Sequence, residues 1–186
     1  ACIGKWHLGL GFRQHDGSPI DLNGPLPWYA GPLPDKNVSE SIDFERSVEG
    51  GPVELGFDEA FFTAGCSTDQ EPFCFIEKDQ FVGMKNAEYR RPVGSWRSGM
   101  TAEDWDNEIV DLIFTERATD FIDGNTGTKP FFLYLPLSAP HSPHLPPSIV
   151  RGVSRAGPRG DQVALVDWCV GKLDEALKRN HMVEDT

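Results

Sequence analysis

A lysine and a histidine stand two residues apart near the start of the chain, in the run Gly4-Lys5-Trp6-His7-Leu8-Gly9. An ammonium group binds an anionic oxygen as a point charge, and an imidazole exchanges protons near neutral pH. The glycines allow a tight turn, and we expect Trp6 to anchor it by apolar packing. Taken singly, Lys5 is typical of a solvated surface lysine, and His7 is typical of a hydrogen-bonded core histidine. Their pairing favours an anion-binding cleft.

A second pair, His141 and His144, lies between prolines in residues 139–144. Zinc sites use three or four protein ligands, and the pattern offers no third one, so we favour an anion contact over a metal site. His141 directly follows an apolar run and is expected to reach the cleft. For His144, contact with a substrate and packing on the loop surface are about equally favoured.

Each pair follows a predicted strand. Residues 1–3 resemble the end of a buried strand, and Phe131–Leu135 is an unbroken apolar run typical of a parallel strand covered on both faces. One helix is predicted to begin at Thr101, where a hydroxyl and nearby carboxylates offer capping, and to stop at Asp123-Gly124. A second is predicted from Gly160 to Arg179. This order indicates an α/β fold whose parallel strands carry ligands beyond their carboxyl ends.

Apolar residues recur at helical spacing in both predicted helices, which indicates one buried face on each. In the first helix, this predicted face comprises Ile109, Leu112, Ile113, Ala118, Phe121 and Ile122. In the second, it comprises Val163, Val166, Val170, Leu173 and Leu177. Asp167 in the second helix is expected to have a buried structural role. The acidic run of Asp104, Asp106 and Glu108 is expected to be the solvated first turn of the first helix.

Residues 10–100 are rich in glycine and proline and are expected to form loops. Within them, Phe73–Ile76 and Gln80–Val82 flank Glu77-Lys78-Asp79, a pattern that predicts a short hairpin. A segment this long without regular structure is usually functional in a compact domain, so we expect an insertion that shapes a substrate site. Three arginines are candidate cations for this substrate site, although we favour a surface position for them: Arg90, Arg91 and Arg97.

Composition excludes several classes of protein. With 29 acidic against 17 basic side chains, the net charge of −12 argues against a nucleic-acid partner. The 39% hydrophobic content is that of a globular chain, and no apolar run reaches the length of a membrane span. Because the whole chain is acidic, a local cluster of lysine and histidine is a specific signal.

The four cysteines show no zinc-ribbon spacing. Cys66 and Cys74 are close enough in sequence for a local disulfide in an oxidising compartment. The alternative is that they are buried thiols acting as small apolar residues, and we favour it.

Five segments of the chain resemble the sulfatase family, and together they span its length. Two of them, GKWHLG at residues 4–9 and KPFFLYLPLSAPHSPHLPP at 129–147, form a specific combination in this order. Supporting segments are GFDEAFF at 56–62, FCFIEKDQFVG at 73–83 and GDQVALVDWCVGKLDEAL at 160–177. The resemblance implies an alkaline-phosphatase-like α/β fold, here a partial sandwich with a parallel sheet core and a long loop and hairpin insertion.

The resemblance also implies a mechanism for sulfate-ester hydrolysis. In that family, a cysteine in a C-x-P-S-R motif becomes formylglycine, whose hydrate attacks sulfur, and a Ca²⁺ ion polarises the sulfate. By motif position, Lys5 would bind the sulfate and the formylglycine hydroxyl. His7 would hydrogen-bond the formylglycine and help to expel sulfate. His141 would contact the sulfate and protonate the departing alcohol, and His144 would belong to the substrate-binding set.

This sequence departs from the family pattern in its nucleophile and metal ligands. It contains no C-x-P-S-R, no Asp pair of the kind that holds calcium at the start of the family's domain, and no later Asp-Asn-Gly segment. We therefore expect residues 1–186 to be an internal part of a sulfatase catalytic domain. Within it, 10–100 would be the insertion and 101–186 a helix-strand-helix unit, inactive without the rest.

The family resemblance leaves three functions open. The first is a periplasmic or secreted sulfatase acting on a sulfated carbohydrate or an aryl sulfate. The second is a phosphodiesterase or phosphonate hydrolase of the same fold, since lysine and histidine also bind phosphate. The third is a non-catalytic relative that binds sulfated glycans. In each case the expected partner is a sulfated or phosphorylated molecule, with no nucleic acid and no membrane.

Overall fold

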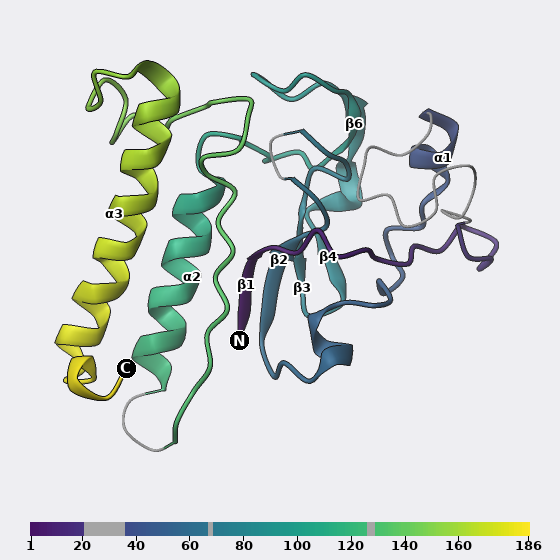
Figure 1. Cartoon of the computed structure of the whole chain (residues 1–186). Coiled ribbons are helices and arrows are strands. Elements are labelled where there is room, and N and C mark those ends of the chain that lie inside the picture. Colours follow the sequence, from purple (N-terminus) through teal and green to yellow (C-terminus); the bar gives the residue numbers. More distant parts are fainter. Residues whose placement is uncertain (21–35, 67–68, 126–128) are drawn as a thin grey trace.

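The computed structural model describes residues 1–20, 36–66, 69–125 and 129–186 (Figure 1). Its main sheet has four strands in the order β1-β2-β3-β4, and a separate two-stranded sheet pairs β5 with β6. The strands are β1 (Cys2–Lys5), β2 (Ala60–Thr63), β3 (Phe75–Glu77), β4 (Gln80–Val82), β5 (Glu88–Arg90) and β6 (Gly99–Thr101). The α-helices are α1 (Lys36–Ser41), α2 (Val110–Gly124) and α3 (Gly157–Arg179). Short 3-10 helices span Pro52–Leu55, Met84–Asn86 and Val183–Asp185.

The main sheet is mixed. β1 and β2 run parallel, with Ile3 opposite Phe61 and Lys5 opposite Thr63. β3 and β4 form an antiparallel hairpin beside β2. The hairpin predicted over residues 73–82 is therefore confirmed, with Lys78 in the left-handed region at φ 58° in its turn. β2 was not predicted, and it places a strand of the main sheet inside the loop-rich range 10–100.

The segment 131–136 lies beside β1 and runs parallel to it. The backbone amides of Ile3 and Lys5 donate to the carbonyls of Tyr134 and Pro136, at 2.9 and 2.7 Å. The predicted direction is confirmed, but the predicted cover on both faces is wrong, because the side chains of Phe132 and Tyr134 are 70% and 39% exposed. The segment forms one isolated bridge and no regular strand. It has β1 on one side, and alternate side chains of an extended segment point to opposite faces.

Gly4 makes this pairing possible. Its φ is 138°, a backbone region that side chains other than glycine rarely adopt. A methyl group on its Cα would collide with the carbonyl of Pro136. Only glycine therefore lets the 131–136 segment approach β1 closely enough to form these hydrogen bonds.

Helix α2 packs on the sheet, and α3 packs on the far side of α2 (Figure 1). The apolar side of α2 joins Ile3, Phe61, Phe75 and Phe114 in one core, in which the Phe75 and Phe114 rings meet edge to face at 5.6 Å. The opposite face of the sheet has its own core around Trp6 and Phe62, whose ring centroids are 6.3 Å apart.

The predicted start of the first helix at Thr101 is wrong. Thr101 is the last residue of β6, and its hydroxyl donates to the carbonyl of Gly99 at 2.9 Å instead of capping a helix. The helix begins nine residues later, at Val110, and ends at Gly124 as predicted. Of its predicted buried face, Ala118 and Ile122 are buried, whereas Ile109 precedes the helix.

Helix α3 lies where predicted but buries a different stripe. Val163 and Val170 are 54% and 55% exposed, and Asp167 is exposed, so these predictions are wrong. The buried residues of α3 are Asp161, Gln162, Leu165, Cys169 and Ala176. Because α3 packs mainly on α2 and not on the sheet, its buried stripe is narrow and includes two polar residues.

Within the loop-rich range 10–100, four prolines lie outside the described residues, namely Pro25, Pro27, Pro32 and Pro34.

The four cysteines, all in the described part of the chain, are buried and form no disulfide. The Cys66–Cys74 disulfide is therefore absent, and the favoured interpretation, that both are buried thiols, is confirmed.

Among the described residues, no helix combines the length and the apolar character that crossing a membrane requires.

We predict that Gly4→Ala lowers the free energy of unfolding by about 3 kcal/mol, from backbone strain and from the collision with Pro136. Urea denaturation followed by tryptophan fluorescence measures it. The matched control is Gly124→Ala at the end of α2, where an added Cβ meets nothing within 4 Å. It should leave stability unchanged or raise it by up to about 1 kcal/mol. Equal effects of the two substitutions would contradict the role of Gly4.

A second prediction concerns the thiols. Burial raises the pKa of Cys2 and of Cys169 to about 11 and also raises the pKa of Cys74. These thiols should therefore resist iodoacetamide at pH 8 in the folded chain. After unfolding without a reductant, all four cysteines should be alkylated, as mass spectrometry of the intact chain can count. A sample treated with reductant is the control, and two fewer adducts without reductant would reveal a disulfide.

Candidate active site

The candidate site lies at the carboxyl ends of β1, β2 and the 131–136 segment. The parallel pairing continues past the strands, because the amides of Trp6 and His7 donate to the carbonyls of Thr63 and Ala64 at 3.0 and 3.1 Å. The chain after Pro136 turns over the same edge toward His141. The two predicted clusters therefore follow neighbouring, parallel segments, as the sequence indicated.

The turn after β1 is built by Trp6 and His7. Trp6 is 5% exposed, and its indole nitrogen donates to the carbonyl of Gly9 at 3.3 Å, as the predicted anchoring role requires. His7 adopts φ 53°, in the left-handed region that few residues other than glycine enter. Backbone in such sparsely populated regions is concentrated at functional sites. The half-buried Lys5 and His7 thus flank a buried, fixed tryptophan.

His141 is exposed on the loop that follows the 131–136 segment. Its Nδ1 lies 2.5 Å from the carbonyl oxygen of Ser142 and 3.1 Å from Sγ of Cys66. A carbonyl oxygen only accepts hydrogen bonds, so Nδ1 carries the proton and Nε2 is left for a ligand. His144 is half-buried on the same loop, and its role in substrate binding stays a prediction.

Sequence analysis missed Asp111 in the first turn of α2. It is 5% exposed, and its carboxylate accepts hydrogen bonds from the amides of Ser138 and Ala139, both at 2.8 Å. Burial raises the pKa of the Asp111 carboxyl, whereas these two amides and the charge of Lys5 act in the opposite direction. The charge of Lys5 is thus near enough to Asp111 to favour its ionised form.

The signal for Asp111 was present but misassigned. A helix that follows a parallel strand runs back antiparallel to it, so its first turn lies at the carboxyl ends of the strands. A helix start at Thr101 predicts an acidic first turn at Asp104, Asp106 and Glu108. These residues precede the helix, so this prediction is wrong. The true start at Val110 puts Asp111 at the sheet edge. Cys66 and Gln162, which also contact the His141 loop, carry no comparable signal.

The three candidate arginines have varied surroundings. Arg97 is paired with Asp69 at 3.6 Å, and Nη2 of Arg90 donates to the carbonyl of Ala102 at 3.0 Å. Arg91 is exposed. The favoured interpretation as surface arginines therefore fits Arg91, whereas Arg90 and Arg97 are half-buried and make contacts within the protein.

The described residues do not fit a calcium site. None of their histidine, cysteine, aspartate and glutamate side chains form a group of three or more that could hold a metal ion. One buried carboxylate oxygen, Oδ1 of Asp69, has no hydrogen-bond partner among the described residues. Calcium takes about six to eight oxygen ligands, so a single carboxylate beside Arg97 does not provide its site.

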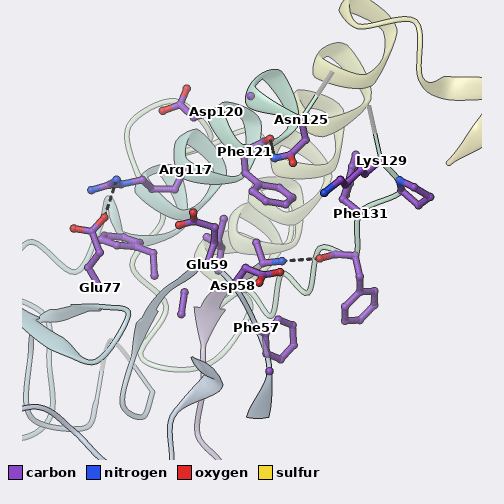
Figure 2. Close-up of a pocket in the computed structure, with 18 of the residues that line it drawn as sticks. Phe57, Asp58, Glu59, Glu77, Arg117, Asp120, Phe121, Asn125, Lys129 and Phe131 are labelled. Carbon is purple, nitrogen blue, oxygen red and sulfur yellow. Dashed lines mark hydrogen bonds and ion pairs between the residues drawn. The ribbon is translucent and has the colours of Figure 1, made fainter. Parts of the chain in front are cut away.

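A hollow of about 780 Å³ lies at the opposite end of the sheet (Figure 2). It is bordered by the amino ends of β1 and β2 and by the end of α2, including Ala1, Ala60 and Phe121. Arg117 and Glu77 also line the hollow, and Figure 2 shows them paired at its border; their ion pair measures 3.3 Å. None of the predicted site residues line this hollow, so it is separate from the candidate active site.

Comparisons with known proteins agree with the sequence motifs. A family model described as Sulfatase matches residues 1–186. The chain is 24% identical over 220 residues to an N-acetylgalactosamine-6-O-sulfatase of Bacteroides thetaiotaomicron, a match that covers 99% of this chain and 38% of that protein. It is 28% identical over 141 residues to the human N-acetylgalactosamine-6-sulfatase, covering 73% of this chain and 25% of the human protein.

A solved chain described with the metabolism of multiple glycosaminoglycans by Bacteroides thetaiotaomicron superposes with a TM-score of 0.70 at 23% identity. The superposition covers 100% of this chain and 40% of the solved one, and it confirms the expected α/β fold class. The chain thus spans about two fifths of the length of the bacterial relative it matches. The family model covers the chain from end to end, and the chain belongs to the sulfatase family.

Proposed function

We propose that the full-length protein containing this chain hydrolyses sulfate esters, and that Lys5, His7 and His141 form one wall of its active site. The observation that carries the proposal is their arrangement: all three follow parallel, hydrogen-bonded segments at one edge of the sheet. In a chain of net charge −12, cations at one edge favour an anionic ligand.

Each residue has a distinct role in this proposal. The Lys5 ammonium binds a sulfate oxygen and stabilises the charge that develops there in the transition state. His141, with its Nδ1 proton directed at Ser142, presents Nε2 to the ester, and in its charged form it donates the proton on Nε2 to the departing alcohol. His7 hydrogen-bonds the nucleophile and assists release of sulfate, and His144 contacts the substrate from the same loop.

The nucleophile and the metal come from outside residues 1–186 in this proposal. Neither C-x-P-S-R nor, among the described residues, a set of metal ligands is present. Formylglycine and Ca²⁺ would therefore be held by other segments of the full-length protein. The calcium would act as a Lewis acid on the sulfate, and this chain would supply the cation and the proton donors opposite it.

The proposed substrate is a sulfated carbohydrate. Two relatives, from Bacteroides thetaiotaomicron and from Homo sapiens, are named for the 6-sulfate of N-acetylgalactosamine. That ester is therefore the first to assay. Residues 10–100 are proposed to shape the sugar pocket, and the location is proposed to be periplasmic or secreted.

We predict that Lys5→Ala lowers kcat/KM of the full-length protein by at least about 100-fold, because one charge-stabilising donor is lost. The assay uses 6-sulfated N-acetylgalactosamine and 4-methylumbelliferyl sulfate, with 4-methylumbelliferyl phosphate in parallel. The control is Lys178→Ala on α3, whose ammonium pairs with Asp174 on the surface, and which should retain full activity. Full activity of Lys5→Ala, or faster hydrolysis of the phosphate ester, would contradict the proposal.

The isolated chain gives a further prediction. Purified alone, residues 1–186 should hydrolyse no aryl sulfate, because they lack the C-x-P-S-R cysteine and a described metal site. The measurement compares 4-methylumbelliferone release by this chain with release by the full-length protein at equal concentration. Turnover by the isolated chain would show that its own residues are sufficient for catalysis.

A further inference from the structure

The loop that carries His141 is held by a side chain from another element. Its residues Ser138 and Ala139 direct consecutive backbone amides at the two oxygens of Asp111, one amide to each oxygen at 2.8 Å. Pro140 has no amide to donate, and the His141 amide donates to the carbonyl of Ser138 at 3.0 Å. Asp111 therefore binds both amides that immediately precede the Pro140-His141 turn.

We infer that Asp111, with Gln162 on the other side of the loop, is the positioning residue that fixes His141 relative to Lys5, an inference that rests on the proposed function. Neither side chain is proposed to touch the substrate. Each is proposed to act through His141, by holding the backbone from which that imidazole projects.

The chemistry of Asp111 suits this role. An ionised carboxylate accepts hydrogen bonds at both oxygens, whereas an amide in its place would direct an NH₂ group at a backbone N–H. Burial raises the pKa of the Asp111 carboxyl, and the two amides and the charge of Lys5 oppose this effect and favour the ionised form. The same carboxylate thus interacts with both halves of the candidate site: with Lys5 through charge and with the His141 loop through hydrogen bonds.

Gln162 from α3 holds the opposite side of the loop. It is 4% exposed, and with its amide oriented to satisfy both neighbours, it donates to the carbonyl of His141 and accepts from the amide of Leu145, each at 3.1 Å. Hydrogen bonds from two helices therefore enclose residues 138–145. His141 itself adds a contact to Cys66, which follows the end of β2 by three residues.

A second aspartate provides a matched comparison within the same chain. Asp161 is 3% exposed, and its two oxygens accept the amides of Gly152 and Ser154, both at 2.8 Å. Asp161 resembles Asp111 in accepting two loop amides, but these hydrogen bonds lower the pKa of its carboxyl, whereas burial raises that of Asp111, and its loop carries none of the candidate site residues. Asp161→Asn therefore controls for losing a carboxylate that binds two loop amides away from the candidate site.

The test uses the full-length protein and compares Asp111→Asn, Asp161→Asn, His141→Ala and the double variant Asp111→Asn/His141→Ala. A proton donor matters more for a poor leaving group than for a good one. If Asp111 positions His141, Asp111→Asn should lower kcat by about 10- to 100-fold on 6-sulfated N-acetylgalactosamine. The loss on 4-methylumbelliferyl sulfate should be smaller. His141→Ala should show the same selectivity, and the double variant should be no slower than His141→Ala.

Asp161→Asn should leave the ratio of the two kcat values unchanged, even where its melting temperature falls. If Asp111→Asn does not fold, Gln162→Leu decides: it should shift the same ratio in the same direction, by a smaller factor. An unchanged ratio in the folded variant, or effects of Asp111 and His141 that multiply, would overturn the positioning role alone. A wild-type protein without sulfatase activity, or a fully active His141→Ala, would overturn the proposed function and this inference with it.

Discussion

The parallel pairing of the 131–136 segment with β1 is the constraint on which the candidate site depends. It requires a glycine at position 4, because the carbonyl of Pro136 lies where any side chain would begin. This pairing aligns the carboxyl ends of two segments more than 120 residues apart in sequence, with Lys5 bonded to Pro136 through its backbone. Without it, the lysine and the histidines would have no common edge.

Electrostatics at this edge differ from those of the chain as a whole. The chain as a whole carries an excess of carboxylates, whereas Lys5, His7 and His141 follow segments that end at this edge, and the buried carboxylate of Asp111 interacts there with the charge of Lys5. That carboxylate accepts the backbone amides of Ser138 and Ala139. The arrangement leaves the imidazole of His141 exposed while hydrogen bonds from two helices hold its backbone, as the proposed role of proton donor requires.

Much of this could be predicted from the sequence, and the failures have physical causes. The hairpin around Lys78 and the end of α2 at Gly124 follow from local turn chemistry, and both are confirmed. The start of α2, in contrast, depends on strand pairing and not on local sequence. Thr101 has the composition of a cap, but β6 pairs it with Glu88, and a strand partner overrides helix propensity. Likewise, the valine pattern of α3 could not reveal that α3 packs mainly on α2.

The sequence by itself determined the family, the candidate site residues and the hairpin around Lys78, because motifs, spacing and turn chemistry are properties of neighbouring residues. Only the tertiary structure decided what holds those residues in place. Asp111 meets Ser138 across 27 positions, and Cys66 meets His141 across 75. Such contacts depend on how helices and loops pack around the sheet, so an acidic residue in a first helical turn does not by itself reveal which distant amides its carboxylate binds.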